Sequence, residues 1–413
     1  MKTRFFFAAA LVALVGWLTL PQGPAQERLD LPRGVDVVTR GPVHEAFAEP
    51  GEAVAQEFLV VPRRPPDPIE ELPPEERPAG TEVTWIPGYW AWDDDSNSFL
   101  WVSGVWRDEP PGRHWVPGFW QEVEGGWHRV SGFWASDQTD LIEYVPPPPE
   151  PIPESVPAAP NDQSAYVPGT WVYTSNRYMW RPGYYVAYQP GWVYTPARYY
   201  WTPGGYVFVD GYWDYPLHQR GLLFAPLRVT TAVATGFRYV PTVVINPDVL
   251  VTSLFVRPAT RTYYFGDYFE NRYTLAGYTP WYDFQLARGV RDPNFAYYHN
   301  TFRDSRWETD LRNLYTGRLQ GRVARPPRTF AEQVQMLSSR TDTNTVSSLR
   351  VAAPITQINN TPITLGGLVN RDDPRVRQAI GDTTVRLQRV PQEARRQYEN
   401  LATNYRRVAE QRR

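Results

Sequence analysis

The pattern of hydrophobic and polar positions divides the chain into strand-like and linker-like stretches. Residues 81–135 and 166–225 contain short runs of aromatic and β-branched residues separated by proline, glycine and serine, which is typical of strands joined by turns. Residues 26–80 and 136–165 are rich in proline, and the first of them is also acidic, so we expect both to be extended linkers. Residues 226–291 hold further short apolar runs, which predict additional short strands.

The pattern becomes helical after residue 291. Asp292 and Pro293 are a favourable cap and first-turn pair, and the stretch that follows to residue 328 is rich in arginine. We expect residues 329–413 to be a polar, partly disordered tail that ends in a charged helix with little apolar face. The predicted fold class is therefore mainly β: two antiparallel aromatic-repeat meanders with glycine bulges, further short strands, and an arginine-rich α-helical C-terminal region.

The first 25 residues have the layout of a secretory signal peptide. Lys2 and Arg4 precede an unbroken apolar run, residues 5–20, and a proline- and glycine-containing stretch follows it. A helical run of this length spans ~24 Å, which is short for the ~30 Å hydrocarbon core of a bilayer. We expect cleavage after Ala25, an exported chain that is periplasmic, at the cell surface or secreted, and no transmembrane span in the mature protein.

A six-residue pattern recurs in the two aromatic blocks. It has an aromatic residue at each end and Pro-Gly or Ser-Gly in the middle, and clear copies occupy residues 85–90, 101–106, 115–120, 129–134, 166–171 and 180–185; the copy at 129–134 departs from the pattern because it begins with Arg129. Looser copies begin at Tyr188, Trp201 and Phe208. The pattern resembles the YXWGXW repeat family of exported bacterial proteins over roughly residues 81–215. The resemblance implies an exported repeat protein. It carries over no catalytic residue, because the family has no assigned activity.

The spacing within each copy predicts a bend in the strand. Side chains five positions apart point to opposite faces of a regular strand, and a glycine-centred bulge would bring both rings onto one face. Proline inside a strand also requires a bulge or an edge. We therefore expect bulges at the motif glycines of both blocks, with positive φ in the first block. The motif glycines are Gly88, Gly104, Gly118 and Gly132 in the first block, and Gly169 and Gly183 in the second.

The positions of the turns predict how the copies pair. Turns near residues 93–98, 107–114 and 124–125 would fold the first block into a four-stranded meander in which copy faces copy. The paired end positions would then form two columns: Trp85, Trp106, Trp115 and Trp134 in one, and Trp90, Trp101, Trp120 and Arg129 in the other. Arg129 would close its column by stacking on Trp120. In the second block we expect Trp171 to face Trp180 and Tyr166 to face Tyr185.

Composition excludes several classes of enzyme. The chain has no cysteine, and therefore no disulfide, thiolate metal site or thiol nucleophile. Lys2 is the only lysine, so a mature chain would lack the lysine of a phosphate-binding loop or a Schiff base. The formal net charge of −2 provides no overall field that would attract nucleic acid. We expect no cofactor and no nucleic-acid partner.

Two small groups of residues are candidates for ligand contact. Trp92, Trp127, Tyr178 and Tyr188 lie outside the paired positions, which makes them candidates for exposed rings. Asp93, Asp95 and Asn97 have the spacing of the first ligands of a calcium loop, but the glycine and the glutamate that such a loop requires further on are absent. A polar hairpin turn accounts for these three residues equally well, and we expect no metal.

These features favour a non-catalytic structural or protein-interaction scaffold of the bacterial envelope, with envelope or cell-surface proteins as partners. The alternative is a polysaccharide-binding protein that uses exposed tryptophan and tyrosine rings. A third hypothesis is an envelope hydrolase with two carboxylates about 5–10 Å apart in a cleft. Burial of the paired tryptophans would favour the scaffold, whereas three or more rings exposed in a row would favour polysaccharide binding.

Overall fold

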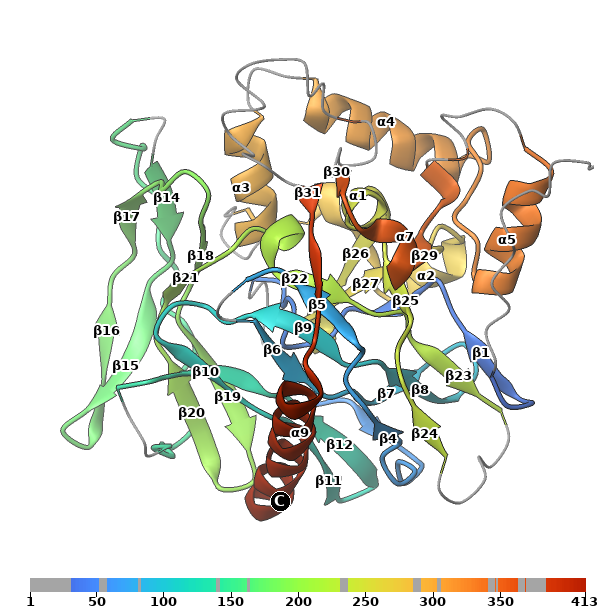
Figure 1. The fold of residues 1–413 in the computed structure, drawn as a ribbon. Coiled ribbons are helices and arrows are strands. Elements are labelled where there is room, and N and C mark those ends of the chain that lie inside the picture. The colour runs from blue at the N-terminus through green and yellow to red at the C-terminus, as the bar shows by residue number, and fades with distance from the viewer. Residues whose placement is uncertain are drawn as a thin grey trace, which may run out of the picture.

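The structure is a computed structural model. The residues that it describes are 31–51, 58–80, 83–138, 142–161, 164–230, 237–284, 291–302, 306–340, 346, 348–362, 368 and 384–413. The predicted signal peptide, residues 1–25, lies outside the described residues. Figure 1 shows a strand-rich body, with helices α3 (Pro293–Thr301), α4 (Trp307–Leu319) and α5 (Phe330–Ser338) along one side and the C-terminal helix α9 (Gln392–Arg412) at the other.

Four repeat units of one design lie within residues 83–136 and 164–214. In each unit two hexapeptides run antiparallel and the strands break at the middle of the hexapeptide, so the outer halves pair in one ladder and the inner halves in another. Repeat unit 1 comprises β6 (Val83–Ile86), β7 (Tyr89–Asp93), β8 (Ser98–Val102) and β9 (Val105–Asp108). Repeat unit 2 comprises β10 (Arg113–Val116), β11 (Phe119–Val123), β12 (Gly126–Val130) and β13 (Phe133–Ser136). Repeat unit 3 comprises β14 (Ser164–Val167), β15 (Thr170–Thr174), β16 (Arg177–Arg181) and β17 (Tyr184–Ala187). Repeat unit 4 comprises β18 (Val193–Thr195), β19 (Arg198–Thr202), β20 (Gly205–Val209) and β21 (Tyr212–Asp214).

The pairings predicted within each hairpin are confirmed. Trp85 faces Trp106 and Trp90 faces Trp101, with ring centroids 5.1 and 5.2 Å apart. The same register recurs in the pairs Trp115–Trp134, Trp120–Arg129, Tyr166–Tyr185 and Trp171–Trp180. Most of the ring pairs meet edge to face, the arrangement that the quadrupoles of aromatic rings favour.

The meander predicted to join the first two hairpins is wrong. β9 pairs with β6 and with β22 (Gly221–Leu223), while β8 pairs with β7 and with β23 (Leu227–Val229). Strands from beyond the repeats therefore occupy the edges that the prediction assigned to repeat unit 2. The two four-membered columns become separate ring pairs: Trp85 and Trp106 belong to one apolar cluster, and Trp90, Trp101, Trp115 and Trp134 belong to the main core.

The motif glycines do not have the predicted positive φ. They are required for space instead, because each lies against the first side chain of the opposite hexapeptide. A Cβ atom on Gly104 would lie 2.5 Å from Cζ2 of Trp85, and one on Gly169 would lie 2.5 Å from Cζ2 of Trp180. The strand therefore bends where a ring crosses a residue that has no side chain.

The N-terminal part of the predicted linker is buried. β1 (Val35–Val37) pairs with β23, β2 (Gly41–Pro42) pairs with β27 (Thr262–Phe265), and Val43 and Phe47 lie in the main core. Three further strands continue the segment: β3 (Val60–Val61) on β12, β4 (Glu70–Glu71) on β24 (Arg238–Tyr239), and β5 (Glu76–Pro78) on β32 (Leu387–Arg389). Residues 31–51 are thus not a solvated linker, because their apolar side chains complete the core.

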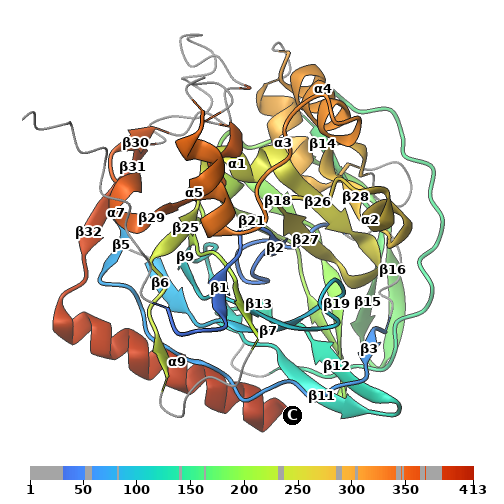
Figure 2. The ribbon, with the colours of Figure 1, turned by 90° about the vertical axis from the view of Figure 1, so that its right-hand side faces the viewer.

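The region beyond the repeats packs on them. Its other strands are β25 (Val243–Ile245), β26 (Leu254–Arg257), β28 (Thr279–Pro280), β29 (Ala352–Pro354), β30 (Thr361–Pro362) and β31 (Thr384–Val385), and its short helices are α1 (Pro247–Leu250), α2 (Asn271–Leu275) and α7 (Ile355–Ile358). The predicted start of α3 is confirmed, since the Asp292 side chain accepts the N–H of Phe295 at 3.1 Å. Helix α9 runs along the outside of the repeats (Figure 2), with Tyr398 against Trp106 at 4.9 Å.

Candidate functional site

A buried glutamate bridges the two bends of repeat unit 1. Glu71 accepts the backbone N–H of Gly88 at 2.7 Å and that of Gly104 at 3.0 Å, and the ring Nε1–H of Trp101 donates to it at 3.2 Å. The two glycines lie where the strands break, and buried backbone N–H groups need an acceptor. Glu71 is 2% exposed, and burial raises its pKa to about 7 against the opposing effect of these hydrogen bonds.

The glutamate belongs to an extended segment that crosses the rings of the unit. We call residues 67–76 strap 1. Trp90 Nε1 donates to the carbonyl oxygen of Asp67 at 3.0 Å, and Trp106 Nε1 donates to that of Glu76 at 2.9 Å. The tryptophans of repeat unit 1 thus bind main-chain carbonyl groups of strap 1 on both sides of Glu71.

Repeat unit 3 holds a second segment in the same way. We call residues 146–157 strap 3. Glu154 accepts the N–H groups of Gly169 at 3.2 Å and Gly183 at 3.1 Å, and Trp180 Nε1 donates to it at 2.8 Å. Trp171 Nε1 donates to the carbonyl oxygen of Glu150 at 2.9 Å.

The spacing along the two straps is the same. Trp90 and Trp171 hold equivalent places in their hexapeptides. The carbonyl that each of them binds, of Asp67 or Glu150, lies four residues before the bridging glutamate.

Repeat unit 2 uses an arginine where the other units have a ring. Arg129 occupies the place of Trp101 and Trp180, and its Nη2 donates to Glu45 at 2.7 Å. Glu45 also accepts backbone hydrogen bonds from Gly118 and Gly132. The guanidinium lies 4.3 Å from the ring centroid of Tyr89, an arrangement that replaces the predicted stacking on Trp120.

Repeat unit 4 differs from the other three. Its hexapeptides are residues 194–199 and 208–213, so the looser copy predicted at Phe208 is confirmed and those at Tyr188 and Trp201 are wrong. Ala197 stands at one bend, and the N–H of Gly211 at the other bend is accepted by its neighbour Asp210 at 2.8 Å. In this unit the acceptor for the glycine N–H is therefore a carboxylate of the hexapeptide itself, not a glutamate from another segment.

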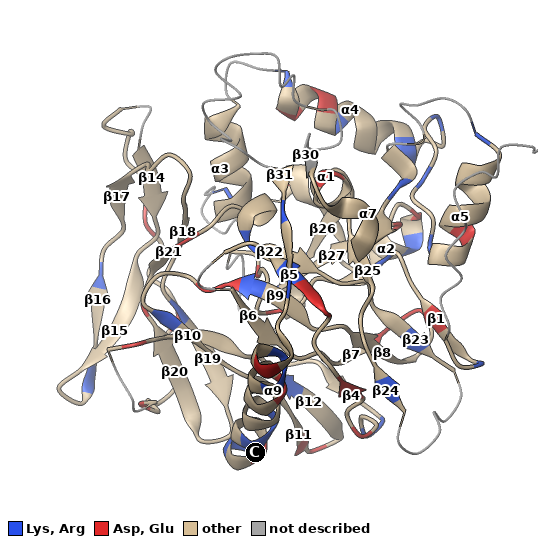
Figure 3. Ribbon diagram, in the orientation of Figure 1, with Lys and Arg blue, Asp and Glu red and all other residues tan. Residues whose placement is uncertain are grey.

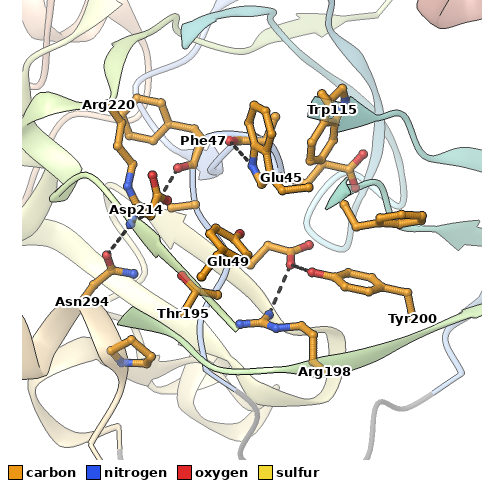
Figure 4. A pocket seen from close by; sticks show the side chains of 16 residues that line it. Glu45, Phe47, Glu49, Trp115, Thr195, Arg198, Tyr200, Asp214, Arg220 and Asn294 are labelled. Atoms are coloured by element: carbon orange, nitrogen blue, oxygen red, sulfur yellow. Dashed lines mark hydrogen bonds and ion pairs between the residues drawn. The ribbon is translucent and has the colours of Figure 1, made fainter. Parts of the chain in front are cut away.

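A cluster of buried charges lies where the segment 44–49 passes between the repeat units (Figure 4). Glu49 accepts hydrogen bonds from Tyr200 at 2.8 Å and from Arg198 at 3.2 Å. Asp214 pairs with Arg107 at 2.7 Å and with Arg220 at 3.1 Å. Burial raises the pKa of Glu49 to about 7.

Two cavities adjoin this cluster. One of about 20 Å³ has room for a water molecule, and one of about 100 Å³ is lined by Glu45, Glu49, Trp92 and Trp120 among others. Glu45 and Glu49 thus line the same cavities, as two carboxylates of a hydrolase would. Each is already held by an arginine, Glu45 by Arg129 and Glu49 by Arg198.

The four candidate contact rings lie in different parts of the fold. Trp127 is 8% exposed and belongs to the core, so its predicted exposure is wrong. Trp92 is half-buried against Phe99, and Tyr188 is half-buried, with its hydroxyl 2.8 Å from that of Thr301. Tyr178 lies in repeat unit 3, where its hydroxyl donates to the carbonyl oxygen of Pro146 in strap 3.

The candidate calcium ligands have protein partners. Asp95 pairs with Arg40, and Asp93 accepts a hydrogen bond from the Ser96 hydroxyl at 2.7 Å. Asn97 takes φ 47° in the hairpin turn. Within the described part of the chain, no group of three or more histidine, aspartate or glutamate residues could hold a metal ion. The turn interpretation accounts for all three residues.

Sequence reasoning missed the bridging glutamates. Glu71 and Glu154 lie 14 and 12 residues before the first ring of their units, inside stretches whose proline content indicated only a linker. The usable signal was the recurrence of a glutamate in the proline-rich stretch before each aromatic block.

The profile of the WXXGXW repeat (2 copies) matches the chain at residues 83–107, 165–184 and 190–213. These ranges fall in repeat units 1, 3 and 4. Repeat unit 2, in which Arg129 begins the second hexapeptide, lies outside them. No curated protein and no solved structure matches the chain. No helix among the described residues is long and apolar enough to cross a membrane.

Proposed function

Taking the chain as a WXXGXW repeat protein, we propose that it is an exported, non-catalytic scaffold of the bacterial envelope that holds other envelope or cell-surface proteins. The observation that carries the proposal is the difference in burial between repeat unit 1 and repeat unit 3. Trp85, Trp101 and Trp106 of repeat unit 1 are fully buried, whereas the strand residues of repeat unit 3 are half-buried or exposed, apart from the buried Val167. The buried units supply a rigid body, and the exposed unit supplies a surface for contact.

Repeat unit 3 has the composition of an interaction surface. It is rich in tyrosine and tryptophan, the residues enriched at protein interfaces. Met179 and Tyr184 are exposed on it, and Figure 3 shows few charged residues on its strands. It lies at the edge of the molecule (Figure 1), away from helix α9, so a partner can reach it.

A photo-crosslinking residue tests this proposal in cells that export the full chain. Met179 is 47% exposed on repeat unit 3, and Leu275, at the end of α2, is 81% exposed outside the repeats. We expect discrete protein adducts in the envelope fraction from position 179 and none from position 275. Equal adducts at both positions, or adducts at neither, would contradict the scaffold role.

A second candidate, polysaccharide binding, is favoured by a groove beside repeat unit 4. This groove, of about 300 Å³, is lined by the rings of Tyr188, Trp192, Tyr194 and Trp213. Arg291 and His299 also line it. Aromatic faces next to polar side chains are a common arrangement in ligand sites. Envelope glycans should bind the parent chain, and binding should fall at least tenfold in Trp192→Ala. No binding to any envelope glycan would remove this candidate.

The two partly buried acids Glu45 and Glu49 do not lead us to propose a hydrolase. Glu45 is held by Arg129 and two backbone N–H groups, and Glu49 is held by Arg198 and Tyr200. A carboxylate with these partners serves the packing of the core, because burying it without them would be costly.

A further inference from the structure

We propose that repeat unit 3 is a docking site for extended, proline-punctuated peptide segments that place a glutamate against its two bend glycines, and that strap 3 is its resident occupant, which such a segment of a partner protein displaces. The inference rests on the proposed scaffold role and names the class of partner that the scaffold holds. It is drawn from the way in which the chain binds its own straps.

The recognition depends on few features of the bound segment. Straps 1 and 3 differ in sequence, yet both supply a glutamate to the two glycine N–H groups and a carbonyl oxygen four residues earlier to a tryptophan Nε1–H. Beyond the carboxylate, the ring donors contact only main-chain oxygens. In repeat unit 3 two tyrosine hydroxyls also bind main-chain oxygens of the strap. Tyr178 donates to the Pro146 carbonyl oxygen, and the Tyr185 hydroxyl lies 2.6 Å from that of Pro157.

This chemistry suits a proline-rich ligand. A polyproline-like segment has a fully solvated backbone whose carbonyl groups remain free to accept hydrogen bonds, and its stiffness lowers the entropy lost on docking. Aromatic grooves that donate hydrogen bonds to such segments are a recurring mode of peptide recognition. The two glycine N–H groups add selectivity for a carboxylate at one position.

Strap 1 is locked in place. Ile69, Glu71, Pro73 and Pro74 are buried. Helix α9 lies against the segment, and its Arg406 Nη2 donates to the Ile69 carbonyl oxygen at 3.4 Å. Arg395 Nε donates to the Pro73 carbonyl oxygen at 3.0 Å, and β4 pairs with β24 in a parallel ladder. A peptide could replace strap 1 only if α9 moved away.

Strap 3 is open to exchange. All of its residues are exposed except Pro148 and Glu154, which are half-buried. Repeat unit 3 complements an acidic segment in charge, because its only charged side chains are Arg177 and Arg181. The strap is nonetheless tethered to its site, and short tethers give effective concentrations in the millimolar range. A free peptide must therefore compete with it.

The test weakens the resident strap and adds the segment in trans. The full mature chain carries Glu154→Ala, and the probe is a fluorescent synthetic peptide of residues 146–161. A matched peptide has glutamine in the place of Glu154. We expect the glutamate peptide to bind the variant at least tenfold more tightly than the glutamine peptide does. It should also bind the unaltered chain at least tenfold more weakly than the variant, because the intact strap competes.

A second substitution locates the bound peptide. Trp171→Phe, added to Glu154→Ala, removes only the Nε1–H that reaches the Glu150 carbonyl oxygen, and it should weaken the glutamate peptide about fivefold or more. Equal binding of the two peptides, or no binding at 1 mM to a variant whose circular dichroism matches the parent, overturns the proposal. Peptide binding without any crosslinked envelope protein would leave the docking site standing and remove the scaffold role. Crosslinked envelope proteins without peptide binding would leave the scaffold role standing and remove the docking site.

Discussion

Glu71 accepts a hydrogen bond of 2.7 Å from the backbone N–H of Gly88, seventeen residues further along the chain. The glycine has two tasks at this contact. It leaves room for the ring of Trp101, whose Cε2 would lie 2.9 Å from a Cβ atom on Gly88, and it frees an N–H group for the carboxylate by ending the strand. The hexapeptide motif is therefore half of a site whose other half is a glutamate outside the repeat.

The space requirement predicts that a methyl group at a motif glycine is damaging. In Gly104→Ala the new Cβ would lie 2.5 Å from Trp85 Cζ2 and 2.6 Å from the Ile86 carbonyl oxygen. Both neighbours are buried, so either the ring or the strand must move. We expect a loss of about 2–4 kcal/mol in the free energy of unfolding, measured by urea denaturation.

Gly204 provides the matched control for this substitution. Its φ is not positive, and the nearest neighbour of a Cβ there is Tyr144 Cδ1 at 3.6 Å, an ordinary contact. Gly204→Ala should change the free energy of unfolding by less than about 1 kcal/mol. A similar loss in the free energy of unfolding for Gly104→Ala and Gly204→Ala would show that lack of space is not the reason for glycine in the motif.

The two bridging glutamates should differ in their importance for stability. Glu71→Ala leaves the N–H groups of Gly88 and Gly104 and the Trp101 Nε1–H buried without an acceptor, and we expect a loss of about 3 kcal/mol or more. In Glu154→Ala water can reach the corresponding groups of repeat unit 3, so the loss should be below about 1 kcal/mol. Urea midpoints of the two variants make the comparison, and a larger loss in Glu154→Ala would contradict it.

The sequence was sufficient to predict the local pairing. Trp85 faces Trp106 and Trp115 faces Trp134 because a short hairpin with a recognisable turn leaves one register that pairs ring with ring. The same reasoning failed between the hairpins. Whether β9 pairs with β10 or with β22 depends on strands more than a hundred residues away, and the local pattern carries no information about them.

The candidate site was only half predictable for a similar reason. The ring ladder follows from the motif, whereas Glu71, Glu154 and Glu45 come from segments whose proline and charge content is typical of linkers. A single glutamate in such a segment belongs to no repeating pattern that would distinguish it from the other acidic residues there. The positive φ predicted for Gly88 was wrong, and glycine is needed there for space, because a Cβ atom would lie 2.9 Å from Trp101 Cε2.

Glu49 predicts a pH dependence of stability that a single variant can isolate. Burial raises the pKa of Glu49 to about 7 in the folded chain, from an ordinary value of 4.5. The folded state thus binds more protons than the unfolded state between these values. The stability that the protonated form contributes is present below pH 4.5 and is lost as the pH rises through 7. Glu49→Gln cannot lose a proton.

The difference in the free energy of unfolding between Glu49→Gln and the parent should therefore move in favour of the variant, by up to about 3 kcal/mol, between pH 4.5 and 7.5. His44 and His218, whose pKa values burial lowers to about 3 and about 4, act in the opposite direction in both proteins, so they cancel in the difference. Urea unfolding at five pH values measures it. A constant difference would mean that Glu49 titrates normally.

Asp214 predicts how firmly the repeat units are joined. It lies at the end of β21 in repeat unit 4 and pairs with Arg107 of repeat unit 1 at 2.7 Å and with Arg220 at 3.1 Å, all three side chains being buried. Asp214→Asn keeps the shape of the side chain but leaves two buried guanidinium groups without a counter-charge, a change that typically costs about 3–5 kcal/mol. Asp210→Asn, four residues earlier, removes an exposed partner of Arg181 and should cost less than about 1 kcal/mol. We expect Asp214→Asn alone to lower the urea midpoint strongly and to expose the repeat units to limited proteolysis. If the two variants unfold alike, the packing of rings and not this charge triad joins repeat unit 4 to repeat unit 1.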